Sequence, residues 1–168
     1  MVEPAFVQTM ARYNAWQNRS LVAAADGLVE AERRRDRGAF FRSIHATFSH
    51  LLWADEVWLH RLIGAPKPAV GGSGSGAYVE DWAEFRARRL ATDEAILEWA
   101  AKLDPEWLRG MLIWYSGAAK REIGKPRAFV VAHLFNHQTH HRGQIHAMLT
   151  AAGAKPDDTD LFLVDEMR

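Results

Sequence analysis

The chain has 168 residues, a formal net charge of zero, 48% hydrophobic residues and no cysteine. This length is sufficient for one domain with its own core, and the hydrophobic content is too high for a disordered protein. The balanced charge excludes a protein whose affinity for nucleic acid comes from a basic surface. Without cysteine there are no disulfides, thiolate ligands or cysteine nucleophiles, so a metal would have to be held by imidazole and carboxylate groups.

The sequence gives no reason to expect a targeting signal or a membrane span. Its N-terminus, MVEPAFVQTM, has no charged-then-apolar pattern, and no apolar run approaches the roughly 20 residues that cross a bilayer. The one local basic run, residues 33–37, is typical of a solvated loop. We therefore expect a cytoplasmic protein that binds neither membrane nor nucleic acid.

Apolar residues at helical spacing predict four long helices, over residues 4–28, 43–62, 79–103 and 126–152. Proline opens the first and last of them, and glycine or proline follows the helix ends, as is typical of helix boundaries. In the third helix, Arg89 and Thr92 interrupt the apolar stripe.

Two connections are unusual. Residues 69–77, AVGGSGSGA, form a Gly/Ser-rich segment whose backbone has no evident reason to order, so we expect a long loop between helices two and three. Residues 107–124 alternate too loosely for a helix and predict a short extended segment or hairpin. The fold class predicted is all-α, a four-helix bundle, with residues 1–168 in a single domain.

The last predicted helix contains His137 and His141, one turn apart on its apolar face. Burying an imidazole without a partner costs about 1–3 kcal/mol, so something must satisfy these ring nitrogens. The spacing places both within reach of one metal ion. Two core histidines bonded to backbone carbonyls or to each other would give the same pattern, and spacing alone leaves both interpretations open.

The second predicted helix offers His45, His50 and His60 as a third ligand. His50 lies beside small residues that leave room for an ion between helices, whereas His45 and His60 project away from the apolar stripe and are expected to be exposed. Asp55 lies near the middle of the apolar face, where an ionised carboxylate needs a partner. It either orients a ligand imidazole or forms a buried link to Arg, Tyr or Trp on a neighbouring helix.

Four segments carry a resemblance to a known family: YNAWQN at 13–18, SHLLWADEVW at 49–58, HLFNHQTHHRGQ at 133–144 and PDDTDL at 156–161. Together they resemble the DinB/YfiT family of small bacterial proteins. The resemblance implies a four-helix bundle, often a homodimer, in which one histidine of the second helix and two of the last bind a metal ion. These positions are His50, His137 and His141, with the neighbouring His140 as the alternative to His141.

Zinc and nickel are the ions that best suit such a site. Relatives with known activities resemble transferases and isomerases that use low-molecular-weight thiols, so the resemblance implies a metal-dependent thiol S-transferase acting on a small electrophile. The alternatives are a non-catalytic metal-binding stress-response protein and a metal-dependent hydrolase. The family name refers to DNA damage, but the neutral charge gives no support to DNA binding.

The sequence also predicts a homodimer. It contains seven tryptophans, more than one small bundle readily buries, and the family resemblance implies the same.

Overall fold

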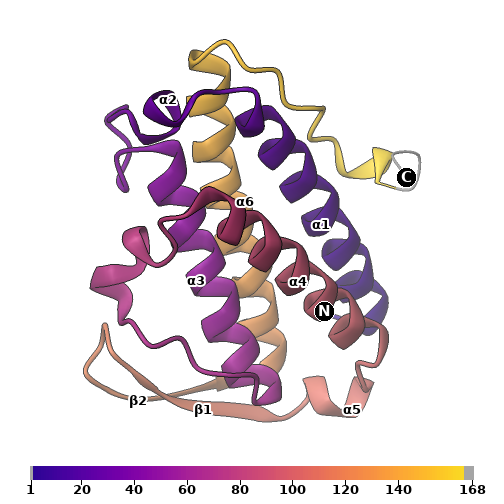
Figure 1. Cartoon of the computed structure of the whole chain (residues 1–168). Coiled ribbons are helices and arrows are strands. Elements are labelled where there is room, and N and C mark those ends of the chain that lie inside the picture. Colours follow the sequence, from indigo (N-terminus) through magenta and orange to yellow (C-terminus); the bar gives the residue numbers. More distant parts are fainter. Residues whose placement is uncertain (1, 165–168) are drawn as a thin grey trace.

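The computed structural model describes residues 2–164, so residue 1 and residues 165–168 of the predicted domain lie outside the described part. The chain is mostly helical, with one small sheet (Figure 1). In chain order the elements are α1 (Pro4–Asp26), α2 (Glu30–Arg34), α3 (Ile44–Ile63), the 3₁₀ helix η1 (Gly72–Ala77), α4 (Trp82–Ala101), α5 (Pro105–Leu108), β1 (Met111–Ser116), β2 (Arg121–Pro126), α6 (Arg127–Ala151) and the 3₁₀ helix η2 (Leu161–Leu163).

Capping residues explain where the long helices begin and end. The Ser43 side chain accepts the backbone N–H of Ala46 at the start of α3, and Asp81 accepts that of Glu84 at the start of α4. Gly64 adopts the left-handed conformation, φ 73°, that ends α3. All four predicted long helices are present, with ends within three residues of those expected from the sequence.

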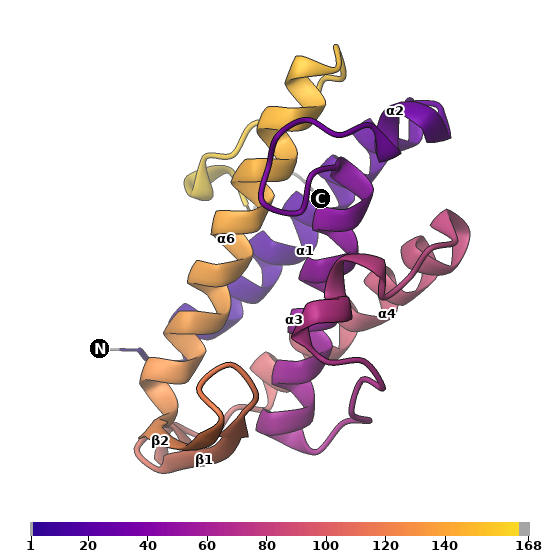
Figure 2. The ribbon, with the colours of Figure 1, turned by 90° about the vertical axis from the view of Figure 1, so that its left-hand side faces the viewer.

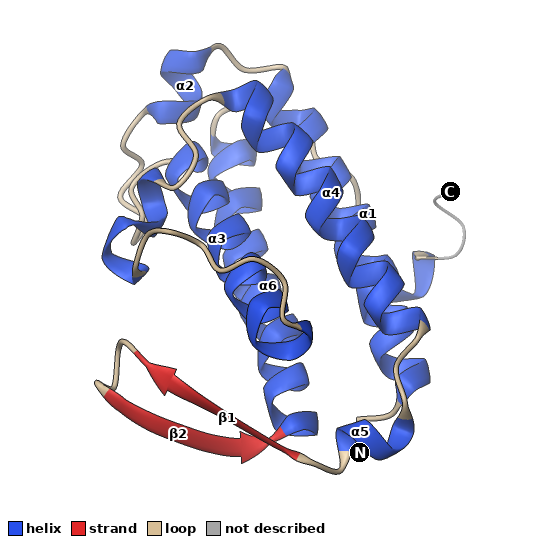
Figure 3. Cartoon of the chain, turned by 60° about the horizontal axis from the view of Figure 1, so that its bottom comes forward, coloured by secondary structure: helices blue, strands red, loops and turns tan. Residues whose placement is uncertain are grey.

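The long helices pack in two pairs. Helix α1 contacts α4 and α6, and α3 contacts α6 and α4. Figure 3 shows α3 beside α6 on one side and α1 beside α4 on the other, with the β1–β2 hairpin running along one end. Two buried apolar clusters fill the interior, one near the hairpin around Phe135 and Ile96, the other around Phe48 and Phe85.

A buried polar layer separates these clusters and receives side chains from all four long helices. Its centre is Arg89 of α4, only 3% exposed, whose guanidinium lies 2.7 Å from the Asp55 carboxylate of α3 and 2.8 Å from that of Asp93. Asn18 of α1 donates to Asp93 at 2.8 Å, and Gln138 of α6 donates to Asp55 at 3.0 Å. The interruption of the apolar stripe in α4 is therefore an ion-pair network that joins the helices.

The network also decides between the two interpretations of Asp55. This carboxylate is fully buried and bonds Arg89 and Gln138, and no hydrogen bond in the described chain joins it to a histidine. The buried link to an arginine is confirmed.

Three expectations need correction. The fold class is not purely all-α, because β1 and β2 pair antiparallel with Met111 opposite Pro126 and Ser116 opposite Arg121. The same pairing confirms the hairpin that was predicted within residues 107–124. The basic run expected in a solvated loop begins within α2, where Arg33 bonds the carbonyls at the end of α1. The Gly/Ser-rich segment contains η1 rather than only unordered chain.

The described chain has no helix both long and apolar enough for a membrane span. This agrees with the expectation drawn from the absence of a long apolar run.

Replacing Arg89 with methionine should lower the free energy of unfolding by about 3–5 kcal/mol, because Asp55 and Asp93 would stay buried without their cation. Urea titration followed by circular dichroism measures this loss. The control is Arg86→Met, whose ion pair with Asp26 is about half exposed and should cost no more than about 1 kcal/mol. Equal losses in the two variants would contradict the structural role assigned to the layer.

Candidate metal centre

Three imidazoles from two helices converge between α3 and α6. His50 comes from α3, and His137 and His141 lie one turn apart on α6. One ring nitrogen from each lies within 4.8 Å of the other two, and the Nε2 atoms of His137 and His141 are 3.2 Å apart. The packing of α3 against α6 thus brings together the three histidines singled out from the sequence, and His141 rather than His140 completes the group.

The orientation of His50 is fixed by η1. Its Nδ1 lies 2.8 Å from the hydroxyl oxygen of Ser75, and that hydroxyl donates its own proton to the Gly72 carbonyl at 2.7 Å. Ser75 Oγ therefore accepts from Nδ1–H of His50. This tautomer leaves an unprotonated Nε2 lone pair on His50, which is the form that binds a metal ion.

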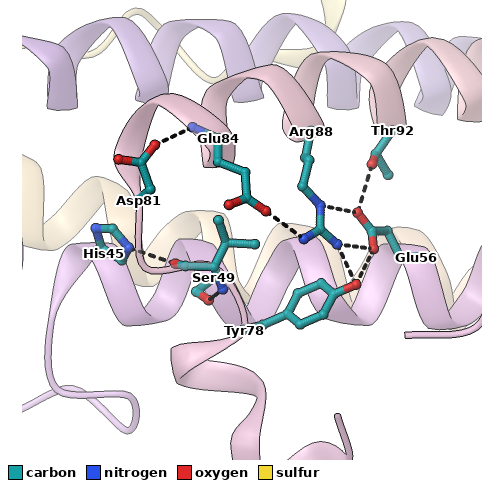
Figure 4. Close-up of polar contacts among 9 residues, drawn as sticks. His45, Ser49, Glu56, Tyr78, Asp81, Glu84, Arg88 and Thr92 are labelled. Carbon is teal, nitrogen blue, oxygen red and sulfur yellow. Dashed lines mark hydrogen bonds and ion pairs between the residues drawn. The ribbon is translucent and has the colours of Figure 1, made fainter. Parts of the chain in front are cut away.

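Ser75 is in place because the chain after η1 is bound to α3 and α4 (Figure 4). The Tyr78 hydroxyl donates to Glu56 at 2.6 Å, and the Val79 N–H donates to Ser49 Oγ at 3.0 Å. The His45 ring nitrogen Nε2 donates to the Val79 carbonyl at 2.9 Å. These bonds explain why a Gly/Ser-rich segment is ordered here.

A second hydrogen bond orients the imidazole of His141. Its Nδ1 lies 2.9 Å from Gln144 Oε1, so Nδ1–H donates to the amide and Nε2 keeps its lone pair toward His137. On His137, Nδ1 is buried and has no hydrogen-bond partner among the described residues. A divalent ion would satisfy the facing Nε2 atoms, and the donor set, three nitrogens with no thiolate, fits zinc or nickel.

Burial keeps the three rings neutral. Loss of hydration lowers the pKa of His50 to about 4 and that of His137 to about 3, and neighbouring imidazoles add to both effects. Desolvation also lowers the pKa of His141, against the raising effect of its bond to Gln144. Neutral imidazole is the ligand form, so no proton has to be displaced from these rings at neutral pH.

Aromatic rings surround the centre on the His50 side. Phe41, in the loop between α2 and α3, stacks on His50 with ring centroids 4.0 Å apart and also contacts His141 at 5.7 Å. Trp53 stacks on His50 at 5.8 Å. Figure 2 shows that loop lying beside α3 and α6. His137 is half-buried, and aromatic side chains shelter the centre on the His50 side.

The remaining histidines of the second predicted helix lie outside the group. His45 was expected to be exposed but is only 3% exposed, because Trp82 and Phe85 pack against its ring and Val79 binds its Nε2. His60 is half-buried rather than exposed, and its Nδ1 bonds the Ala65 carbonyl.

Sequence reasoning missed Ser75 and assigned no orienting role to Gln144. Ser75 stands in a low-complexity stretch whose composition predicts no contact with His50. Gln144 could have been found, because it follows His141 by three residues and so lies on the same face of the helix.

The family model for the DinB family matches residues 1–168, the whole chain. The chain belongs to the DinB family. None of the curated proteins or solved structures searched matches it. Family membership and three close histidines together fit a metal-binding protein.

Purified protein should contain one divalent ion per chain, and His137→Ala should abolish its binding, whereas His60→Ala should retain it; elemental analysis measures both.

Removing the ion with a chelator should lower the melting temperature by roughly 5–10 °C, because an ion present at a hundred times its Kd stabilises by about 2.7 kcal/mol. A melting temperature unchanged after verified removal would contradict a site within the folded core.

Replacing Ser75 with alanine should weaken metal binding by roughly 10–100-fold, because His50 then loses the acceptor that fixes its tautomer and ring orientation. Competition with a chromophoric chelator measures the affinity. Ser73→Ala is the matched control, since Ser73 is exposed in the same helix η1. Equal affinities for the two variants would show that the Ser75 hydroxyl is dispensable.

Proposed function

We propose that this DinB-family protein is a four-helix bundle that binds one divalent transition metal ion through His50, His137 and His141. The observation that supports this most strongly is the pair of outer hydrogen bonds, from Ser75 and Gln144, that direct the Nε2 lone pairs of His50 and His141 toward the group. His45 also has one ring nitrogen bonded, to the Val79 carbonyl, but no second imidazole of the described chain lies within hydrogen-bond distance of it, whereas the Nε2 atoms of His141 and His137 lie 3.2 Å apart.

We further propose that the protein is a thiol S-transferase. Structural zinc sites are closed by four protein ligands, whereas three ligands are typical of reactive sites. Within the described chain, the group of possible ligands contains three histidines and no carboxylate. A divalent ion bound here would lower the pKa of a thiol or a water molecule at its open position.

The chain's own residues would supply position and shelter. The three imidazoles define where the sulfur arrives, and Phe41 and Trp53 restrict water around His50. With a halogenated electrophile, the thiol loses its proton to solvent and the sulfur forms a bond to the carbon that carries the halogen. The halide leaves with the electron pair of the carbon–halogen bond. Because the protein has no cysteine, the thiol must come from outside.

The second candidate is a metal-binding protein without turnover, and metal-dependent hydrolysis is a third. The aromatic cover of Phe41 over His50 favours the second candidate over hydrolysis, because it restricts access of water to that face.

A homodimer remains a prediction from the family resemblance. The second reason for expecting a homodimer, that one small bundle does not readily bury seven tryptophans, is wrong, because all seven are buried or half-buried.

The metal-loaded protein should accelerate conjugation of a low-molecular-weight thiol to a halogenated aromatic compound. His137→Ala should lower the rate to that of the reaction without protein, and His60→Ala should leave it unchanged. The measurement is the halide released over time with a panel of bacterial thiols. A fully loaded protein that is inactive with the whole panel would favour the non-catalytic alternative, and release of halide without any thiol would favour the hydrolase.

A further inference from the structure

Arg61, in the last turn of α3, differs from the other sheltered arginines. It is half-buried, yet it has no hydrogen bond and no carboxylate within 4.0 Å among the described residues. Every other buried or half-buried arginine of the described chain bonds a carboxylate, a polar side chain or a backbone carbonyl: Arg33, Arg37, Arg88, Arg89, Arg127 and Arg142. A sheltered guanidinium without a counter-charge is costly, and desolvation lowers the pKa of Arg61.

Two tryptophans hold this guanidinium. Its central carbon lies 4.5 Å from the ring centroid of Trp58 on α3 and 5.6 Å from that of Trp114 on β1. No nitrogen of Arg61 is among the buried, unpartnered atoms of the described chain, so its donor edge reaches solvent. Trp114 belongs to the inward side of β1 and packs against the buried apolar cluster near the hairpin.

The guanidinium lies on the same side of the α3–α6 pair as the candidate metal centre. His133 is one turn before His137 on α6, with ring centroids 5.7 Å apart, and His133 contacts Trp58 at 5.3 Å. A line of side chains therefore runs from His137 through His133 and Trp58 to Arg61. Figure 2 shows the hairpin that carries Trp114 at the end of α3 and α6.

We infer that Arg61, held by Trp58 and Trp114, binds an oxyanion of a ligand whose other end reaches the three-histidine centre. A guanidinium presents paired N–H donors that match a carboxylate or phosphate. Here Trp58 and Trp114, whose ring centroids lie 5.5 Å apart, both contact it, and its solvent-exposed donor edge is available to a ligand. The identity of the ligand rests on the proposed function, under which it is a thiol that also carries a carboxylate. The oxyanion site itself does not depend on the metal.

The first experiment tests the oxyanion site with small probes. Hexanoate and inorganic phosphate are titrated into isotopically labelled protein, and the indole N–H signals are followed by NMR, with Trp58→Phe and Trp114→Phe used for assignment. Hexanoate should shift the signals of both tryptophans in the wild type and in Arg121→Met, an exposed arginine of the same hairpin.

Arg61→Met keeps an apolar stem over Trp58, so the variant should stay folded, but it should lose the hexanoate response. Arg61→Lys keeps the charge without the paired donors and should bind more weakly than the wild type. A larger response to phosphate would assign the same site to a phosphate group. No response to either anion, or the same response in Arg61→Met, would show that Arg61 only covers Trp58 and would overturn the inference.

The second experiment joins the site to the centre. Pairs of thiols of equal chain length, one ending in a carboxylate and one in an alcohol, are titrated into the cobalt-loaded protein and followed by the visible and near-ultraviolet spectrum. At the length that spans both groups, the carboxylate member should bind about 10–100-fold more tightly, and Arg61→Met should remove this advantage while leaving the alcohol member unchanged.

The two experiments separate the inference from the proposed function. If no thiol changes the cobalt spectrum but hexanoate binding still depends on Arg61, the thiol-transferase proposal fails and the oxyanion site stands. If thiols bind the metal and the carboxylate gives no advantage at any length, the link between Arg61 and the centre is wrong.

Discussion

The structure depends on one buried group of charges that must be neutralised where no water reaches them. Arg89 faces Asp55 and Asp93 in the middle of the fold, and each partner comes from a defined face of its helix. Since an unpaired charge in this position is far more costly than an exposed one, the helices have little freedom to rotate or slide. The bond from Gln138 to Asp55 then joins α6 to α3 at the residue next to His137. The relative placement of the two histidine-bearing helices is therefore set immediately beside the site.

A similar dependence operates at the edge of the site. His50 is oriented by Ser75, Ser75 is held in η1, and the chain after η1 is fixed by its bonds to Ser49 and Glu56. Each step is an ordinary hydrogen bond, yet together they convert a flexible composition into a fixed support. The centre is thus built by three segments of the chain, although only two of them contribute imidazoles.

The sequence predicts the long helices well because their apolar residues recur at helical spacing, and it predicts the His137–His141 pair because an i,i+4 relation is local. It fails where a contact comes from a distant segment. His45 points away from the apolar stripe of its own helix, but the chain returning at Val79 covers it. Arg89 interrupts a stripe when α4 is considered alone, and only the packing with α3 shows its partner. The isolation of Arg61 is likewise invisible in the sequence, since it is defined by the absence of a nearby carboxylate among the residues that the structure describes.

The centre joins opposite halves of the chain, because His50 and Ser75 precede α4 whereas His137 and His141 belong to the last long helix. Such a site forms only after α6 has packed against α3. This contact joins segments far apart in the sequence, so the entropy lost in closing the loop between them is offset only once the contact has formed. Interactions that are absent from the folding transition state act on the rate of unfolding and leave the rate of folding unchanged. An ion bound here would thus slow the unfolding of the native state without accelerating its folding.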